Sequence, residues 1–570
     1  MNRIFPILNW LPNYQRQYFK SDLFAGFTVA VLLIPQAMAY ALLAGLPPIV
    51  GLYAALVPLI IYPIFGTCRQ LAVGPVALDS ILVAAGVGAL AAAGSEDYIA
   101  LAMLLAIIVG VLHLALGIFR LGFVVDFLSN PVISGFTSAA AIIIAFSQLR
   151  HLMGIAMPPS QEIDRLVVYL VGHLEEFHLP TFYIGATCLV ILIFFKRWKP
   201  NFPGALVAVV VSTLAVWLLR LDQYGIPIVG TVPGGLPQPS IPEFDLETIN
   251  SLLPIALTIA FVSFMEGFAV AKRISSKNSY EVNTDQELIS LGFSNISAGL
   301  FGGYPITGSF SRSAVNANAG ALTGISSFVT AGVVALTLLF LTPVFYFMPK
   351  AVFAAVIIVA VLGLVDYKEM KRLYRIGRSD LLVMLFSFAF TLFLGIQTGV
   401  LLSIAASVVM ILAHITRPHI AFLGQIPGTD TLRNVRRVDD AQIIDGIIIV
   451  RMDASFYFAN ISYFKDRLYE VINRRSQPVK AVIIDGSSIH KIDSSAETVL
   501  YDVINDLNAE NIELYFTNIR GPLRDRLKRS GFYDTLGTDH FFYTKKQAVS
   551  YALKNCMKKT AEENDRPPIV

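Results

Sequence analysis

The chain has 570 residues, of which 55% are hydrophobic and only 15% are charged, and its formal net charge is +3. A water-soluble chain of this length needs more polar surface, and a charge this small argues against nucleic acid as a partner. Its three cysteines, Cys68, Cys188 and Cys556, match no metal-ligand spacing. With no nucleotide loop or nucleophile constellation either, we expect no enzyme, metal or cofactor.

The first 20 residues combine charged residues with aromatic residues such as Trp10 and Tyr14. They lack the apolar centre and small-residue cleavage site of a signal peptide. Residues 1–20 are therefore predicted to be an interfacial segment on the cytoplasmic side of the membrane.

About fourteen apolar stretches follow, several of them close to the roughly 20 residues that a helix needs to cross a bilayer. They are predicted at 23–43, 47–66, 75–94, 98–119, 131–150, 180–197, 203–220, 251–271, 285–302, 310–320, 322–342, 349–365, 379–396 and 398–416. The expected fold class is an all-α polytopic membrane domain over residues 21–417.

Basic residues in the short loops predict the orientation of these spans. If the N-terminus is cytoplasmic, most loop lysines and arginines lie inside, and the outer side receives only Arg150, Arg165, Arg220 and Lys350. An even number of spans also returns the C-terminus to the cytoplasm. We therefore expect a multi-pass protein of the cell membrane with both termini inside.

A proline-rich connection, about 221–250, separates the first seven spans from the last seven. Because seven is odd, the two halves would sit in the membrane with opposite orientation. This topology is typical of the inverted repeats of secondary transporters.

Two interrupted segments occupy corresponding places in the two halves, Ala72–Ser80 in the third span and Gly303–Arg312 in the tenth. Each places a proline and small residues before an apolar helical stretch. Each would present a helix N-terminus, with free N–H groups and a positive dipole end, near the middle of the membrane. Two such ends facing each other predict an anion-binding site.

Arg312 adds a full positive charge beside the second helix end, and a charge at membrane depth is a functional candidate. A structural ion pair with Glu266 is the alternative, and both interpretations can hold together. Helical spacing places Ser309 and Ser313 on one side with Arg312 adjoining, so hydroxyl groups could also bind the anion. Close packing of small residues between helices is the alternative for the serines.

Two further carboxylates lie within apolar spans. Glu266 could carry a coupling proton, or it could remain ionised as the partner of Arg312. Asp79 could stabilise a helix dipole, or it could bind a cation or a proton. Gln36 and Tyr40 share a face of the first span, and their polar groups suit either an oxyanion or a neighbouring helix.

These residues resemble the sulfate permease (SulP) family of anion transporters. The matching runs are Ile34–Tyr40, Leu46–Tyr53, Leu71–Val76, Met265–Ala271 and Gly308–Asn316. The resemblance implies fourteen spans organised as a core and a gate, an elevator-like motion and a homodimer. It further implies a small anion substrate, membrane lipid as surroundings, and a coupling proton rather than sodium.

The resemblance also assigns roles to individual residues. Substrate contacts fall on Gln36, Tyr40, Val76, Ala77, Phe310, Ser311 and Arg312. Glu266 matches the carboxylate linked to proton coupling in the branch that transports sulfate. Asp79 departs from the expected pattern, which leaves the coupling stoichiometry open.

The composition changes after Arg417. A linker is expected over 418–435, followed by strands at 443–452, 480–485 and 513–517 and helices near 460–474, 494–509 and 521–530. Residues 436–556 resemble a cytoplasmic STAS domain, a small soluble α/β module. Ser495 matches a serine that is phosphorylated in bacterial relatives, although Asp493 or Ser494 as a helix N-cap explains the same run. Residues 557–570 are predicted to be disordered.

The leading functional hypothesis is proton-coupled uptake of sulfate or a similar oxyanion. Transport or exchange of bicarbonate or a dicarboxylate is an alternative within the same class, because sequence defines charge complementarity better than anion shape. An anion channel, or an anion sensor that signals through the STAS domain, is the alternative from another class. A titratable Glu266 beside Arg312 favours a coupled transporter over a simple channel.

Overall fold

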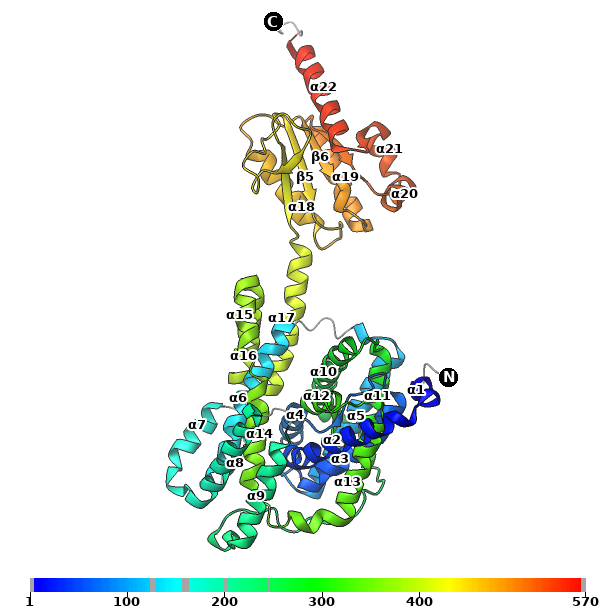
Figure 1. Ribbon diagram of the computed structural model, residues 1–570. Helices are drawn as coiled ribbons and strands as arrows, with labels where there is room; N and C mark the ends of the chain where they lie inside the picture. Colours follow the sequence, from blue (N-terminus) through cyan, green and yellow to red (C-terminus); the bar gives the residue numbers. More distant parts are fainter. Residues whose placement is uncertain (1–4, 124–129, 156–162, 199–201, 244, 565–570) are drawn as a thin grey trace. The chain divides into compact units, whose positions relative to one another are not determined.

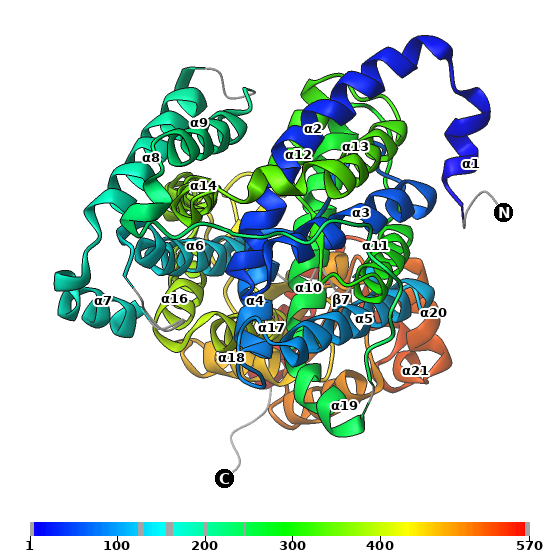
Figure 2. The same cartoon turned by 90° about the horizontal axis from the view of Figure 1, so that it is seen from below.

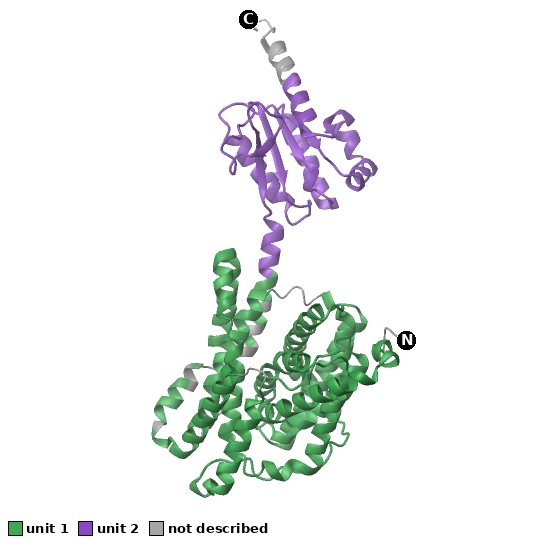
Figure 3. Cartoon of the chain, viewed as in Figure 1, with its two compact units in different colours: residues 1–408 green, residues 409–570 purple. Residues whose placement is uncertain are grey.

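The computed structural model describes residues 5–123, 130–155, 163–198, 202–243 and 245–564. The chain divides into two compact units, Met1–Val408 and Val409–Val570 (Figures 1 and 3). The first unit is almost entirely helical, and the second contains a six-stranded sheet.

The helices of the first unit form two groups that lie side by side in both views (Figures 1 and 2). The first group contains α1 (Ile7–Trp10), α2 (Arg16–Leu43), α3 (Pro48–Phe65), α4 (Ala77–Val87), α5 (Glu96–Ile118), α10 (Leu246–Lys277), α11 (Thr284–Leu300), α12 (Phe310–Asn318) and α13 (Ile325–Leu336). The second contains α6 (Asn130–Met153), α7 (Ile163–Gly172), α8 (Leu179–Trp198), α9 (Gly204–Leu218), α14 (Lys350–Val361), α15 (Tyr367–Ile376), α16 (Arg378–Leu394) and α17 (Ile396–Thr416).

Each predicted span coincides with a helix, so the predicted fold class is confirmed. Within the described residues, 8 helical segments are long and apolar enough to cross a membrane alone. The helices of the two interrupted segments are shorter, with 11 residues in α4 and 9 in α12. The third span, predicted over 75–94, ends earlier because α4 stops before Gly88 in a run of small residues.

Glycines allow close packing of helices α5 and α11 in the first unit. A Cβ atom on Gly110 would lie 2.7 Å from the carbonyl oxygen of Gly292, and one on Gly299 would lie 2.5 Å from that of Met103. Such small residues let helix backbones approach closely where no hydrophobic effect drives association. The close contact of α5 with α11 joins the two sequence halves inside the first helical group.

A two-residue ladder also joins the sequence halves. Strand β1 (Val73–Gly74) pairs antiparallel with β2 (Thr307–Gly308). Each strand leads directly into a short helix, β1 into α4 and β2 into α12. The ladder therefore satisfies the extended backbone of both interrupted segments inside the protein, as non-helical backbone at membrane depth requires.

The second unit has the sheet order β4-β3-β5-β6-β7-β8, with β5 to β8 parallel. Its strands are β3 (Ile420–Gln425), β4 (Leu432–Asn434), β5 (Ile447–Met452), β6 (Ala481–Asp485), β7 (Glu513–Thr517) and β8 (Phe541–Phe542). Its helices are α18 (Ile461–Asn473), α19 (Ser494–Ala509), α20 (Gly521–Arg529), α21 (Phe532–Leu536) and α22 (Lys545–Asn564).

The three predicted strands correspond to β5, β6 and β7, and the three predicted helices correspond to α18, α19 and α20. Their alternating order builds parallel strands with helical crossovers. Strands β3, β4 and β8 were not predicted. β4 and β8 form the two edges of the sheet and have only 3 and 2 residues, whereas β3 lies between β4 and β5 and is only partly buried. β3 and β4 also lie in the stretch 418–435 that was predicted to be a linker. Helix α22 continues to Asn564 into the region predicted to be disordered, and residues 565–570 lie outside the described part of the chain.

Candidate functional site

The candidate site is built around the N-termini of α4 and α12. The residues that precede these helices, Val76 and Ser309, have extended backbones, and neither provides a side-chain cap. Because β1 and β2 are neighbours, the two N-termini start from the same ladder. The segments that lead into the two helices are therefore held together, and convergence of the first N–H groups on one anion stays a prediction.

Arg312 is fully buried in the first turn of α12. Its Nη1 donates a hydrogen bond to the carbonyl oxygen of Pro75 at 2.9 Å, which ties α12 to the segment before α4. Its Nε and Nη2 have no hydrogen-bond partner among the described residues. A buried guanidinium with unused donors is the group that a bound oxyanion would satisfy.

Gly74 makes room for this guanidinium. Its φ of +142° lies in a region that favours glycine, and a Cβ atom there would lie 3.4 Å from Arg312 Nη2. A side chain at this position would therefore be strained and would crowd the cation. The glycine of the interrupted segment is required by the backbone and by the approach of Arg312.

The serines next to Arg312 have different environments. Ser313 Oγ accepts a hydrogen bond from the backbone N–H of Ala72 at 2.8 Å, so this hydroxyl holds the two segments together. Ser309 is buried and Ser311 is exposed, and their Oγ atoms lie 3.3 Å apart. Ser309 and Ser311 therefore retain hydroxyl groups that can turn toward an anion.

Helix α2, which packs against both α4 and α12, supplies two further predicted contacts, Gln36 and Tyr40. Tyr40 is buried and lies within electrostatic range of Arg312 and Glu266. The Oε1 atom of Gln36 is buried and has no partner among the described residues. Val76 and Ala77 are buried where α4 begins, so they can contact an anion mainly through their backbones.

Phe310 differs from the other predicted contacts because 46% of its surface is exposed. The guanidinium of Arg273 on α10 lies 5.1 Å from the centre of its ring, within the range of a cation–π contact. Phe310 and Arg273 therefore lie at the accessible edge of the site, next to the buried Arg312.

The two intramembrane carboxylates differ from the carboxylates that stabilise the fold. Asp79 is fully buried and neither of its carboxylate oxygens has a partner, and Glu266 Oε2 is likewise unpartnered, among the described residues. In contrast, Glu287 accepts from the Tyr62 hydroxyl at 2.6 Å and the Cys68 N–H at 3.0 Å. Asp22 similarly accepts from the Leu322 N–H at 2.7 Å.

Glu266 and Arg312 act on each other electrostatically, and Asp79 lies within range of Glu266. The ion pair expected as an alternative role for Glu266 is absent at hydrogen-bond distance among the described residues, because Glu266 Oε2 and two nitrogens of Arg312 have no partner. Arg312, Glu266 and Asp79 thus form a cluster of incompletely paired charges.

Sequence analysis missed several residues that support this cluster. Tyr304 is fully buried, its hydroxyl lies 3.1 Å from Ser80 Oγ, and it is within range of Asp79 and Arg312. Asn295 bonds both backbone groups of Ile306, donating to its O at 3.0 Å and accepting from its N–H at 2.8 Å. Each is a polar residue in a mainly apolar stretch, a signal too weak to separate it from residues that only pack.

Other missed residues bring α10 and α5 to the cluster. Thr307 Oγ1 donates to the carbonyl oxygen of Ser263, and a Cβ atom on Gly267 would lie 2.7 Å from that Oγ1. The buried His113 on α5 has its Nε2 2.7 Å from the carbonyl oxygen of Ala260. These contacts fix the part of α10 that carries Glu266.

In the second unit, Asp493 is the N-cap of α19. Its Oδ1 accepts from the Ala496 N–H at 2.8 Å, and its Oδ2 accepts from the Phe458 N–H at 2.9 Å. Ser495, the candidate for phosphorylation, is exposed in the first turn of this helix. The capping interpretation therefore accounts for Asp493, and phosphorylation of Ser495 stays a prediction.

Two short helices, α4 and α12, begin from one ladder beside a buried arginine, inside a bundle of apolar helices. This arrangement is typical of membrane transporters of anions. Residues 19–387 match the sulfate permease family and residues 440–548 match the STAS domain. The chain belongs to the sulfate permease family, and its second unit contains a STAS domain.

Similar proteins carry transporter names. The chain is 39% identical to sulfate transporter 4.1, chloroplastic, of Arabidopsis thaliana, over 99% of this chain and 84% of that protein. It is 34% identical to a probable sulfate transporter of Mycobacterium tuberculosis, over 94% of this chain and 96% of that protein.

A solved structure shares the fold over both units. Murine Slc26a9, described as an anion transporter in the inward-facing state, matches with a TM-score of 0.89 and 26% identity. The match covers 97% of this chain and 94% of that chain. The chain is therefore a multi-pass membrane protein with the architecture of an anion transporter.

Proposed function

We propose that this protein takes up sulfate, or a similar divalent oxyanion, together with protons. The observation that carries the proposal is the cluster at the N-termini of α4 and α12. It combines a buried guanidinium that has unused donors with two carboxylates, Asp79 and Glu266, that have unpartnered oxygens among the described residues.

A charge balance explains why protons would accompany the anion. Arg312 contributes +1, and the two helix N-termini contribute roughly +0.5 each, so together they match a dianion. Ionised carboxylates at both Glu266 and Asp79 would cancel this positive charge, so a dianion would no longer be attracted to the site. Sulfate therefore binds when these carboxyl groups hold protons, which links anion binding to proton uptake.

Glu266 and the substrate are proposed to alternate as the counter-charge of Arg312. Without an anion, the Glu266 carboxylate serves as a counter-charge for Arg312, with which it interacts electrostatically. When sulfate takes that role, Glu266 accepts a proton and becomes a neutral neighbour. Asp79, fully buried and unpartnered among the described residues, is proposed to hold a proton while the anion is bound.

An elevator-like motion is proposed for the transport step. The ladder of β1 with β2 and the hydrogen bond from Arg312 to Pro75 tie α4 to α12. The anion-binding residues therefore belong to the first helical group, which would move as a body against the second. Formation of a homodimer, through surfaces outside this site, accompanies the proposal on the basis of family resemblance.

The proposed location is the cell membrane, with both termini in the cytoplasm. This orientation places the basic residues of most short loops inside. The names of the relatives support sulfate as the first substrate to test.

The test is uptake of radiolabelled sulfate into proteoliposomes, with and without an inward proton gradient, and with bicarbonate, chloride or dicarboxylates as competitors. Stimulation of sulfate uptake by the gradient is the expected result. Sulfate uptake that does not depend on the proton gradient but requires another anion inside the proteoliposomes would establish exchange in place of symport. Flux of a competitor without sulfate flux would assign another substrate.

A further inference from the structure

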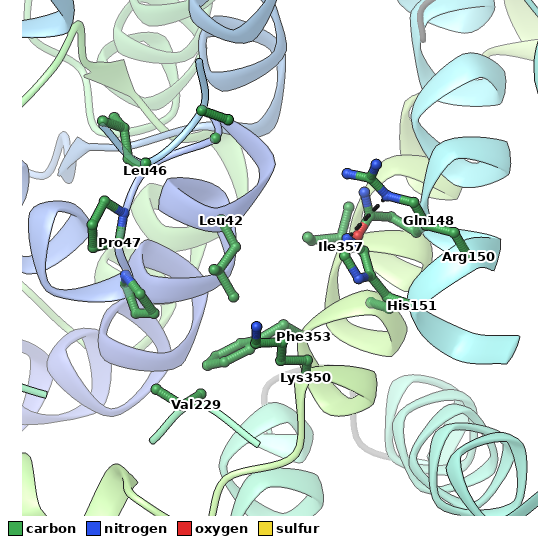
Figure 4. Close-up of a pocket in the computed structure, with 15 residues that line it drawn as sticks. Leu42, Leu46, Pro47, Gln148, Arg150, His151, Val229, Lys350, Phe353 and Ile357 are labelled. Carbon is green, nitrogen blue, oxygen red and sulfur yellow. Dashed lines mark hydrogen bonds between the residues drawn. The ribbon is translucent and has the colours of Figure 1, made fainter. Parts of the chain in front are cut away.

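A second cavity lies between the two helical groups, apart from the candidate site. Its volume is about 400 Å³ (Figure 4). One wall comes from the turn between α2 and α3, including Leu42 and Pro47, and from Ala93 after α4. The other wall comes from the end of α6 and the start of α14. None of the residues assigned above to substrate binding lines this cavity.

The second wall is basic. Arg150, His151 and Lys350 line it, and no acidic side chain is among the described residues that line the cavity. Figure 4 shows Arg150 and His151 across the cavity from Leu42 and Pro47, with Lys350 between the two sides at the bottom of the view. Arg150 Nε donates to His151 Nε2 at 3.1 Å, which fixes the two side chains beside one another. The cavity therefore combines positive charge with an apolar opposite wall.

Helix stability does not explain the position of Lys350. This lysine is the first residue of α14, where the positive end of the helix dipole disfavours a cation. Helix α3 also begins in the cavity, at Pro48, and neither helix has a side-chain cap. Lys350 and the two helix N-termini thus add their positive potentials in one cavity, which favours an anionic occupant.

Backbone contacts hold both walls in place. The proline-rich connection crosses beside α14, where the Val229 N–H donates to Met348 O at 2.9 Å and the Lys350 N–H donates to Pro227 O at 2.8 Å. On the opposite wall, Gly45 turns the chain with a φ of +78°. The cavity is therefore a feature of the fold rather than a gap between loose side chains.

Helix α2 connects this cavity with the candidate site. Tyr40 belongs to the candidate site, and Leu42 two residues later lines the cavity, an axial rise of roughly 3 Å. The cavity lies at the end of α2 that is opposite to its N-terminus, so the proposed orientation places it on the outer side. Arg150 and Lys350 are among the few basic residues that sequence analysis assigns to that side.

We propose that this cavity is a second binding site for small divalent oxyanions. It serves as an outer vestibule that concentrates the anion next to the first helical group before transport. Its role in transport rests on the function proposed above, whereas binding of an oxyanion does not. A lipid phosphate group has the same chemistry as a free oxyanion, so the experiment separates these two sources.

Charge-selective labelling tests the vestibule without any transport. Ala93 is exposed and lines the cavity, so an A93C variant can be modified there by methanethiosulfonate reagents. We expect the anionic sulfonatoethyl reagent to react about 10-fold faster than the cationic trimethylammonium reagent, because a positive cavity concentrates anions. The unsubstituted chain gives the background from its own cysteines.

Charge removal identifies the source of this selectivity. Adding R150Q and K350Q to A93C should abolish the preference for the anionic reagent, whereas adding R220Q should not. Arg220 is the matched control because it is exposed, is assigned to the same side and does not line the cavity. K350R should keep the preference. Equal effects of R220Q and of the R150Q/K350Q pair would overturn the proposal.

Protection by sulfate separates a free anion from a lipid headgroup. Sulfate should slow anionic labelling of A93C equally in phosphatidylcholine vesicles and in vesicles that contain phosphatidylglycerol. If phosphatidylglycerol alone blocks the labelling and sulfate has no further effect, the cavity binds a lipid headgroup. That result would overturn the proposal of an anion vestibule.

Sulfate uptake into intact cells then tests the role in transport. The R150Q/K350Q variant should have a KM for external sulfate that is about 10-fold higher, with little change in the maximal rate. The reason is that positive charge in the cavity increases the rate at which sulfate associates with the protein, not the rate of the later transport step. An unchanged KM together with lost labelling selectivity would reject the role in transport and retain the binding site. Absence of sulfate uptake in the unsubstituted protein would instead reject the proposed function, and the labelling result would still stand.

Discussion

At the scale of single residues, the contacts of Arg312 are those of a residue that binds a ligand and not of one that only holds the fold together. Only one of its nitrogens, Nη1, has a hydrogen-bond partner among the described residues, the carbonyl oxygen of Pro75. Its planar donors suit the oxygens of an oxyanion. The structure therefore leaves the anion-binding part of the guanidinium available.

We expect R312A to abolish measurable sulfate binding, because both the charge and the donors are lost. R312K should retain weak binding, since lysine keeps the charge but lacks the fork of donors. Scintillation proximity with radiolabelled sulfate on purified protein measures both variants, and gel filtration shows whether they remain folded. Wild-type affinity in a folded R312A variant would place the anion elsewhere.

Glu266 and Glu287 form a matched pair of carboxylates for testing proton coupling. Glu266→Gln should remove most of the dependence of sulfate uptake on external pH, because the amide cannot take up a proton and only Asp79 remains to titrate. Glu287→Gln should weaken the fold, since it disturbs bonds from Tyr62 and Cys68, but should keep the pH dependence. Uptake measured in proteoliposomes over a range of external pH decides between them. Identical pH profiles for wild type and E266Q would remove Glu266 from coupling.

Asp79 gives a separate prediction. Asp79→Asn imitates the protonated carboxyl group, so sulfate binding should persist in this variant and should weaken less than in the wild type as the pH rises, because only Glu266 remains to titrate. Equilibrium binding of radiolabelled sulfate at several pH values measures this. Loss of binding at every pH would show that the site needs the carboxylate itself.

The sequence allowed prediction of the residues whose chemistry is unusual for a membrane helix. A charge such as Arg312 or Glu266 stands out in an apolar stretch, because its burial is costly. Supporting residues could not be recognised in the same way. Tyr304 contacts Ser80, more than two hundred positions away, and Asn295 contacts the backbone of Ile306 across the turn after α11, and no local pattern distinguishes either residue from ordinary packing.

At the scale of elements, the contact of α5 with α11 depends on glycines. Gly110→Leu should destabilise the first unit by roughly 1–3 kcal/mol, because the new side chain would overlap the backbone of Gly292. Gly332→Ala in α13 is the control, since a Cβ atom there has no neighbour within 4 Å. Thermal unfolding in detergent, followed by tryptophan fluorescence, compares the two variants. Equal midpoints would show that α5 and α11 can separate without cost.

Apolar length and glycine–proline breaks were sufficient to predict the helices, but not their grouping. The interrupted segments show the reason. Short strands such as β1 and β2 have two residues each, and their partners lie more than two hundred positions apart in the sequence. Their pairing could be inferred only from the corresponding places of the segments in the two halves.

At the scale of the whole molecule, the two units are stabilised by different interactions. The first relies on apolar helices and close backbone contacts, whereas the second has its own hydrophobic core around β5, β6 and β7. Asp485 at the end of β6 is a buried charge in that second unit. Its Oδ2 accepts from Lys545 Nζ at 2.9 Å and its Oδ1 accepts from Asn518 Nδ2 at 3.1 Å.

This carboxylate predicts how the second unit responds to acid. Burial opposes ionisation, but hydrogen bonds from Lys545 and Asn518 outweigh it and lower the pKa of Asp485. Because the folded pKa is below the unfolded one, the stabilisation is complete above about pH 4 and is lost as the pH falls through the folded pKa. Asp485→Asn should therefore cost about 1.5–3 kcal/mol at pH 7 and much less near pH 2.

Chemical denaturation of a fragment containing residues 409–570, followed by circular dichroism, measures this difference. D506N is the control, because Asp506 pairs with Lys465 on the exposed surface. A cost of D485N that stays constant from pH 7 to pH 2 would contradict the assignment.

The ladder between β1 and β2 also has a consequence for biosynthesis. Val73 and Gly74 are translated long before Thr307 and Gly308. Until the later residues leave the ribosome, the earlier segment must wait in the membrane without its partner strand, and Pro75 O must wait without Arg312. The binding site for the anion therefore forms only after α12 has been inserted, well into the second half of the membrane domain. A nascent chain that stops before Arg312 should contain most of the early helices and still bind no substrate.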